Sequence, residues 1–348
     1  MQSVRYLPQH QSAIEGLLDD VPFKSSIWQW QFEAMAGDEG FDPVVIEKDG
    51  RIIGFNGVIP ADVLYRGESV AALWSCDFYV DVTCRGQGVG RFIKQTLVKK
   101  SPLIMTFGVS EAAAQVLKRI GWVQATDVYH YRYTRLWRKP RYLAMQLLQR
   151  FNLLRGLWRR AVPFDCNLQW TESLPEAVEV DALWQRVEAG YQKVVRRNYR
   201  YLNWRYQQHP LASYRFLCAR DSNRGELLGM LVVREHHGIV RLVDWVGALK
   251  DEVLPRAMIR DCLFHYRAAH QFTATTTSAT GFSQALTDLG FFPSRTRPAF
   301  FVTSCLPQDQ DPAQGWFLTA GDSDGEFLQA ARNHYQATGM GKGEYANS

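Results

Sequence analysis

Arg85-Gly86-Gln87-Gly88-Val89-Gly90 is the stretch around which the rest of the chain can be interpreted. It follows an apolar, aromatic run from Trp74 to Val80 that is typical of a strand, and it precedes apolar residues at helical spacing between Phe92 and Val98. Glycines let the backbone approach a ligand closely, and the first-turn amides of a helix have no partner inside that helix. The stretch therefore predicts a site for an anion such as a phosphate. The alternative is a glycine-rich connector without a ligand.

Two features of this region resemble one family. The segment Arg85-x-x-Gly88-x-Gly90 resembles the acetyl-coenzyme A pyrophosphate loop of the GCN5-related N-acetyltransferase (GNAT) superfamily. Downstream, a buried-looking strand, Leu103 to Val109, precedes an Ala-rich helix, Glu111 to Arg119, and then Gly121-Trp122, which is the order of elements in that superfamily. The sequence has neither the G-x-G-x-x-G of a Rossmann site nor the G-K-[ST] of a kinase-type phosphate loop.

The resemblance implies a cosubstrate, acetyl-coenzyme A, and no metal. In the superfamily the central strand pairs its exposed backbone with the pantetheine arm, a role that would fall here to Phe78, Tyr79 and Val80. The residues that would hold the pyrophosphate are Arg85, Gly86, Gln87, Gly88, Val89, Gly90 and Arg91.

A transfer to an amine requires a base, because the amine must be neutral when it attacks. Asp77 is the only carboxylate inside the central strand and is our candidate base; alternatively, it satisfies backbone or arginine donors. Strict alternation along the strand would place Asp77 with Ser75 and Tyr79, on the face opposite to Cys76 and Phe78.

The acceptor side and the leaving group are less well defined. Trp28 and Trp30 are candidates for a wall of the acceptor site, with core packing as the alternative. The superfamily typically has a tyrosine four residues before the glycine of the Gly-aromatic pair, where it protonates the departing thiolate, and this chain has Leu117 there. Either another group supplies that proton, with Tyr129, Tyr131 and Tyr133 as candidates, or the thiolate leaves without one.

The second half of the chain repeats the first. Trp30 corresponds to Trp204, and Asp77 corresponds to Asp244. The aspartates precede the closing glycines at 121 and 290 by 121 − 77 = 44 and 290 − 244 = 46 residues. In the second copy, Glu252 stands where the first has Arg85, and Pro255 removes an amide donor, so we expect no cofactor binding of the same kind there.

The 348 residues therefore predict an α/β fold of tandem GNAT-like domains, each with a mixed, mostly antiparallel sheet flanked by helices. The expected parts are a GNAT domain (1–134), a basic amphipathic linker helix (135–164), a degenerate GNAT-like domain (165–305) and a C-terminal tail (306–348). The linker has eight basic and no acidic residues between 135 and 160, which suits either a membrane surface or packing between the domains. The acidic run from Gly321 to Glu326 does not follow the order of a calcium loop, and we expect an aromatic strand that ends in an acidic turn.

The remaining features of the sequence narrow the range of possible functions. Six cysteines without a C-x-x-C pair, an N-terminus without a signal-peptide pattern, and no apolar stretch of membrane-spanning length favour a cytoplasmic protein. Our leading hypothesis is an acyl-coenzyme A-dependent N-acyltransferase whose acceptor is a primary amine, first of all an amino sugar or a polysaccharide precursor. The alternatives are a non-catalytic coenzyme A-binding or membrane-surface adaptor and an aminoacyl-transferring enzyme of the same tandem type. The net charge of +5 and the absence of a nucleic-acid-binding signature disfavour a nucleic-acid partner, and the oligomeric state stays open.

Overall fold

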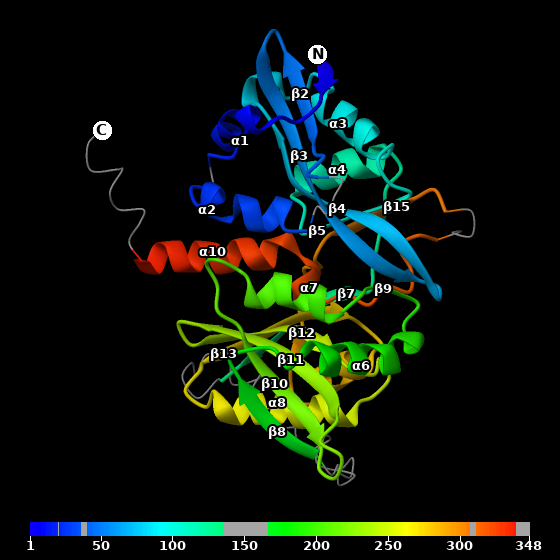
Figure 1. The fold of residues 1–348 in the computed structure, drawn as a ribbon, viewed down its shortest axis with the longest axis vertical. Coiled ribbons are helices and arrows are strands. Elements are labelled where there is room, and N and C mark those ends of the chain that lie inside the picture. The colour runs from blue at the N-terminus through cyan, green and yellow to red at the C-terminus, as the bar shows by residue number, and fades with distance from the viewer. Residues whose placement is uncertain (20, 36–39, 136–165, 307–310, 339–348) are drawn as a thin grey trace.

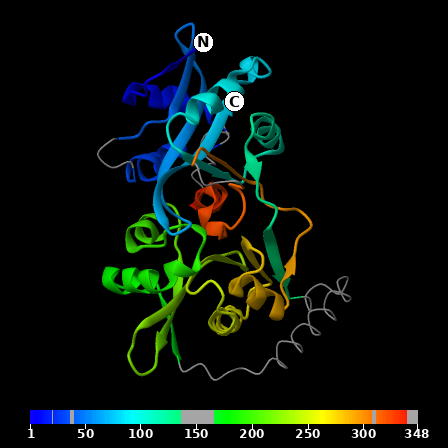
Figure 2. The same cartoon turned by 90° about the vertical axis from the view of Figure 1, so that its right-hand side faces the viewer.

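The computed structural model of the chain describes residues 1–19, 21–35, 40–135, 166–306 and 311–338. Two sheets lie one above the other, with helix α10 (Asp324–Thr338) crossing between the two halves (Figures 1 and 2). The predicted tandem α/β architecture is confirmed. The predicted basic helix at 135–164 falls almost entirely outside the described residues.

The first sheet has eight strands, most of them antiparallel. Its path runs through β1 (Gln2–Val4), β2 (Val44–Lys48), β3 (Arg51–Tyr65), β4 (Glu68–Val80), β5 (Leu103–Phe107), β15 (Phe300–Ser304) and β6 (Val123–Gln124), and β9 (Lys193–Val195) pairs with β3. Helices of this half are α1 (Gln11–Leu17), α2 (Lys24–Trp28), the π-helical turn η2 (Gln29–Glu33), α3 (Val89–Leu97) and α4 (Glu111–Arg119). The Asp49-Gly50 pair forms a tight turn between β2 and β3, and both residues have positive φ.

The second sheet has seven strands and the same pattern. Its order is β14 (Phe292–Pro293), β7 (Val128–Thr134), β13 (Gln271–Thr277), β12 (Ile239–Val246), β11 (Leu227–His236), β10 (Arg215–Asp221) and β8 (Cys166–Thr171). Its helices include α6 (Ala177–Val187), α7 (Tyr199–Leu202), the π-helical turn η8 (Asn203–Gln207), α8 (Val253–His265) and α9 (Gly281–Asp288).

The two halves exchange a strand. β7 follows the first-half elements in sequence but pairs with β13 of the second sheet, whereas β15 follows the second-half elements and pairs with β5 of the first. Each sheet is therefore completed by a strand from the other half of the sequence, and neither half contains its whole sheet within one continuous segment. The sequence did not predict this exchange.

A symmetric contact holds the two copies together at the residues on which the repeat was recognised. Trp30 lies on η2 and Trp204 on η8, and their rings stack with centroids 5.3 Å apart. Each indole nitrogen donates to the backbone oxygen of the other tryptophan, and both hydrogen bonds measure 2.8 Å. Equivalent residues thus meet across an approximate two-fold relation, as in a symmetric dimer interface.

Candidate functional site: two splayed strand pairs

In the first sheet, the parallel strands β4 and β5 pair only at Leu73 with Ile104 and at Trp74 with Met105. Beyond these pairs the strands separate, while β5 continues to pair with β15 along its other edge. We call the separated part, from Ser75 and Thr106 onward, the first splay. It leaves the inner backbone edge of β4 without a strand partner from Ser75 to Val80. This segment includes Phe78, Tyr79 and Val80, to which the family resemblance assigned the pantetheine arm.

A cavity of about 660 Å³ lies at this splay. The predicted cofactor residues that line it are Phe78, Tyr79, Val80, Arg85, Gly86, Gly88, Val89, Gly90 and Arg91. Gln87 was predicted too, but it does not line the cavity; its side chain donates to the backbone oxygen of Thr83 at 3.0 Å. The sequence analysis missed the lining residues Cys84, Ser110, Ala112, Ala113, Val116, Arg119 and Ile120. Most of these belong to α4 or its cap, whose helical pattern was the available signal.

The glycine loop has the geometry of an anion site. Gly88 has a φ of 84° and caps α3, and the first hydrogen bond of the helix runs from the Phe92 amide to the Gly88 oxygen at 3.0 Å. The amides of Val89, Gly90 and Arg91 precede that bond and belong to the unpaired first turn. Their direction and the helix dipole favour a phosphate in the cavity.

Two contacts fix the entrance to this loop. The Arg85 side chain donates from Nε to the Val80 oxygen at 3.1 Å and lies over the Tyr79 ring, with 5.4 Å between the guanidinium carbon and the ring centroid. Arg91 and Arg119 also line the cavity, so that three guanidinium groups surround it. This positive charge suits a diphosphate.

Asp77 lies at a β-bulge, and the predicted strict alternation of side chains is wrong there. Phe55 of β3 pairs with Tyr79, but Gly57 pairs with Cys76, so two residues of β4 face one residue of β3. Asp77 takes a φ of 47° to accommodate the extra residue. As a result, Cys76 and Asp77 lie on the same side, where the amide of Gln31 donates to both of them.

Asp77 is closely held on that face. The Lys24 ammonium forms an ion pair with its Oδ2 at 2.6 Å, and the Gln31 amide donates to the same oxygen at 3.0 Å. The side chains of Lys24 and Asp77 are 2% and 5% exposed, so water screens the pair only weakly. Asp77 is therefore an ordered carboxylate on the face of β4 opposite to α3.

The opposite face of β4 carries a buried lysine that the sequence analysis did not single out. Lys94 of α3 donates to Asn56 Oδ1 at 2.6 Å and to Ser75 Oγ at 2.7 Å, and its ammonium lies 4.3 Å from the centroid of the Phe78 ring. Burial lowers the pKa of Lys94 to about 7.

The remaining candidate residues have packing roles. Trp28 and Trp30 are buried, at 2% and 8% exposure, and Trp30 belongs to the contact between the copies. Leu117 is fully buried under the first sheet. The candidates for a thiolate proton donor in β7 contact the second half: Tyr133 packs against Phe272 and Phe291, and Tyr129 packs under Arg297. None of the three β7 tyrosines lines the 660 Å³ cavity.

In the second sheet, β12 and β13 also separate, beyond Leu242 and Ala274. We call this the second splay. The chain itself occupies it: Leu318 and Thr277 exchange backbone and side-chain hydrogen bonds along the inner edge of β13, and the Thr319 hydroxyl donates to Asp244 on β12 at 2.8 Å. The expected aromatic strand at Trp316–Thr319 thus contributes only isolated bridges, followed by the short turn Ala320–Asp322 and by α10.

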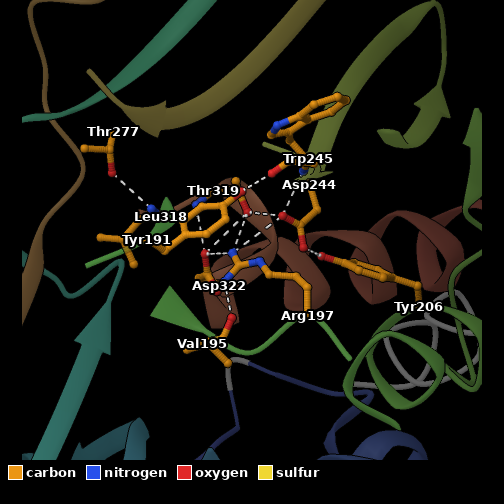
Figure 3. Close-up of polar contacts among 11 residues, drawn as sticks. Tyr191, Val195, Arg197, Tyr206, Asp244, Trp245, Thr277, Leu318, Thr319 and Asp322 are labelled. Carbon is orange, nitrogen blue, oxygen red and sulfur yellow. Dashed lines mark hydrogen bonds and ion pairs between the residues drawn. The ribbon is translucent and has the colours of Figure 1, made fainter. Parts of the chain in front are cut away.

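A buried polar cluster closes the second splay (Figure 3). Arg197, with no exposed surface, contacts Asp322 at 2.5 Å and Asp244 at 3.5 Å, and Tyr206 donates to Asp244 at 2.8 Å. Gly321 lies against this cluster, where a Cβ atom would be 1.9 Å from the Tyr206 hydroxyl. The second splay is therefore filled, which adds a steric reason to the expectation that this copy binds no cofactor in the same way.

Comparisons with known proteins agree with this geometry. Residues 11–111 match the model of the acetyltransferase (GNAT) family. This part of the chain is thus similar to a GNAT domain. No curated protein matches the chain.

Solved structures share the fold across most of the chain. A probable N-acyltransferase of unknown function from Enterococcus faecalis V583 superposes with a TM-score of 0.64 and 12% identity over 87% of this chain and 72% of that one. A GCN5-related N-acetyltransferase from Anabaena variabilis gives 0.59 and 12% identity over 86% and 72%. A tandem GNAT protein from the clavulanic acid biosynthesis pathway gives 0.51 and 15% identity over 88% and 99%. At these identities the similarity shows the tandem GNAT fold and not the substrate.

Among the described residues, no helix is both long and apolar enough to cross a membrane, and no group of His, Cys, Asp and Glu is arranged to hold a metal ion.

Proposed function

We propose that the protein is an N-acyltransferase that moves an acetyl group from acetyl-coenzyme A to a primary amine, with an amino sugar or a polysaccharide precursor as the first class of acceptor. The observation that carries the proposal is the cavity at the first splay, because it joins three parts that a coenzyme A thioester needs. These parts are a helix N-terminus with a glycine loop for the pyrophosphate, a free strand edge for the pantetheine amides, and a gap between strands for the thioester.

The chemistry follows from this arrangement. The amine nitrogen attacks the thioester carbonyl carbon, the C–S bond breaks, and sulfur leaves with the electron pair as a thiolate. The pantetheine would hold the thioester between β4 and β5, and the acceptor would approach from the face of β4 that carries Cys76 and Asp77. Fixing both reactants in one orientation supplies much of the rate enhancement that such transfers need.

The proposal is tested by following the release of free coenzyme A thiol from acetyl-coenzyme A in the presence of a panel of primary amines that includes amino sugars. Gly90→Leu is the matched control, because a Cβ at position 90 would already lie 3.1 Å from the Phe78 ring and a longer side chain would project into the cavity. We expect release with the parent protein that depends on the amine, and little release with the variant. Release that no amine of the panel stimulates would contradict the proposal.

A further inference from the structure

The C-terminal helix α10 begins at the end of β5 in the first splay (Figure 1). The Ser323 hydroxyl donates to the backbone oxygen of Phe107, the last residue of β5, at 3.4 Å. A Cβ atom on Gly108 would lie 3.1 Å from Ser323 Oγ and 3.6 Å from Asp324 Oδ1. Asp324 thus lies against the first residue after β5, where the strands of the first sheet have already separated.

The second domain fixes the position of this helix start. Arg205 donates to the backbone oxygen of Ser323 at 2.5 Å. One residue earlier, Asp322 is bound by Arg197, and two residues after Asp324, Glu326 accepts from Arg234 at 2.8 Å and pairs with Arg241. Asp324 is held between these anchors, so its carboxylate has a defined position at the first domain although it comes from the far end of the chain.

Asp324 differs from its acidic neighbours in its partners. Asp322 and Glu326 each pair with arginine. Although the residue keeps some exposed surface, the carboxyl group of Asp324 is enclosed among charged and titratable groups contributed by four elements of the fold. These groups are Asp77, Lys24 and Arg205, together with Cys76 and Lys94, whose own pKa values respond to Asp324.

The surroundings of Asp324 favour proton exchange by its carboxyl group at neutral pH. Burial, and then the charge of Asp77, raise the pKa of Asp324 to about 7. Arg205, the backbone amide of Gly325 and, least of all, Lys24 oppose this rise in the pKa, and Lys24 is already paired with Asp77 at 2.6 Å. A carboxylate with a pKa near the working pH is well matched to general-base catalysis.

We infer that Asp324, supplied by the C-terminal helix, is the base that accepts the proton of the acceptor amine, and that Asp77 is a positioning residue that orients the amine and maintains the negative field around Asp324. The inference rests on the proposed function. The amine arrives as an ammonium ion, to which the two carboxylates are complementary, and one proton passes from its nitrogen to an oxygen of Asp324. The neutral nitrogen then attacks the thioester carbonyl carbon and the C–S bond breaks. The nitrogen gives its second proton to water as the amide forms, the departing thiolate takes a proton from water, and Asp324 later returns its own proton to solvent.

The test compares Asp324→Asn with Asp77→Asn, and uses Asp19→Asn, an exposed carboxyl, as the control. The two acceptor probes are glucosamine, which is largely protonated at neutral pH, and hydroxylamine, which is largely unprotonated. We expect Asp324→Asn to lower kcat for glucosamine by roughly 100-fold or more. We expect a much smaller loss for hydroxylamine, because that probe needs less help from a base.

The pH profile separates a base from a structural residue. The parent kcat should rise through about pH 7 as Asp324 loses its proton, and this limb should be absent in Asp324→Asn. In Asp77→Asn the rise of kcat should occur at lower pH, because loss of the negative charge at position 77 lowers the pKa of Asp324. Calorimetric titration of acetyl-coenzyme A shows that each variant is folded and still binds the cosubstrate.

Two results would overturn the inference alone: an active parent whose rate and pH limb survive Asp324→Asn, or a variant that binds acetyl-coenzyme A and loses both probes equally. A parent that releases no thiol with either amine would instead refute the proposed function and the inference together.

Discussion

The two splays of this protein share a topology and differ in what lies between the strands. In each, parallel strands separate after a short paired segment, and an aspartate sits beside a bulge in the central strand, Asp77 in β4 and Asp244 in β12. The first splay opens into a cavity lined by a glycine loop, whereas the second is occupied by Leu318, Thr319 and Asp322. A duplicated fold thus keeps one ligand site and converts the other into core.

The C-terminal segment links these two outcomes. Asp322 lies in the second splay and pairs with Arg197. Two residues later, Asp324 lies against Gly108 at the first splay. The segment that fills the second copy therefore also contributes a carboxylate to the first. The second domain therefore has a structural role, because it holds that segment in place.

The largest effect is expected from breaking the cluster that closes the second splay. Arg197→Met would leave Asp244 and Asp322 buried without their cation, and we expect a loss of about 3–5 kcal/mol in the free energy of unfolding. Urea denaturation measures this loss. The matched control is Arg220→Met, which removes a partly exposed pair with Glu179 in the same domain and should cost about 1 kcal/mol or less. Equal losses in the two variants would show that the cluster adds no special stability.

The next effect concerns the open splay. Gly90→Leu should weaken acetyl-coenzyme A binding by about 100-fold, or ~2.7 kcal/mol, because its side chain would occupy the approach of the pyrophosphate. Calorimetry measures the dissociation constant. Gly16→Leu is the control, because a Cβ at position 16 meets no atom within 4 Å. Unchanged affinity in Gly90→Leu would remove the loop from the site.

A smaller, pH-dependent effect distinguishes the helices under the two splays. α3 buries Lys94, whereas the residues that α8 buries are all apolar. The pKa of Lys94 is lowered to about 7 in the folded protein from 10.5, so the unfolded chain binds more protons between these pH values. The parent should therefore gain stability relative to Lys94→Met as pH rises from 7 to 10. Unfolding free energies measured across this interval check the sign, and a constant difference would contradict the lowered pKa.

The last pair of substitutions should not change the number of acetyl-coenzyme A sites. Restoring loop chemistry to the second copy with Glu252→Arg and Pro255→Gly removes the repelling charge and returns an amide donor, but the chain still fills the second splay. Calorimetry should give the same number of acetyl-coenzyme A sites as for the parent. An additional site would show that the altered loop, and not the filled splay, prevents the second copy from binding acetyl-coenzyme A.

Local patterns in the sequence predicted much of the first site. Glycine spacing and the strand before it identified the loop, and a constant offset between aspartates and closing glycines identified the repeat. Features set by distant contacts were missed. The bulge that moves Asp77 to the face of Cys76 depends on pairing with Phe55 and Gly57 of another strand.

The strand exchange and the placement of Asp324 have the same origin. Nothing in the residues of β7 and β15 indicates that each pairs with the other half, because strand partners are chosen across the whole chain. The acidic run at 321–326 was visible in the sequence, but its division between two splays depends on arginines more than 80 residues away, such as Arg205, Arg234 and Arg241.

The difference between the two splays implies that the first binds acetyl-coenzyme A and that the second cannot. Hydrogen–deuterium exchange of the parent protein, measured with and without acetyl-coenzyme A, locates the bound cosubstrate directly. We predict slower exchange at 78–91 and 108–120, and unchanged exchange at 243–256 and 316–322. Protection at the second splay, or the absence of protection at the first, would contradict the account.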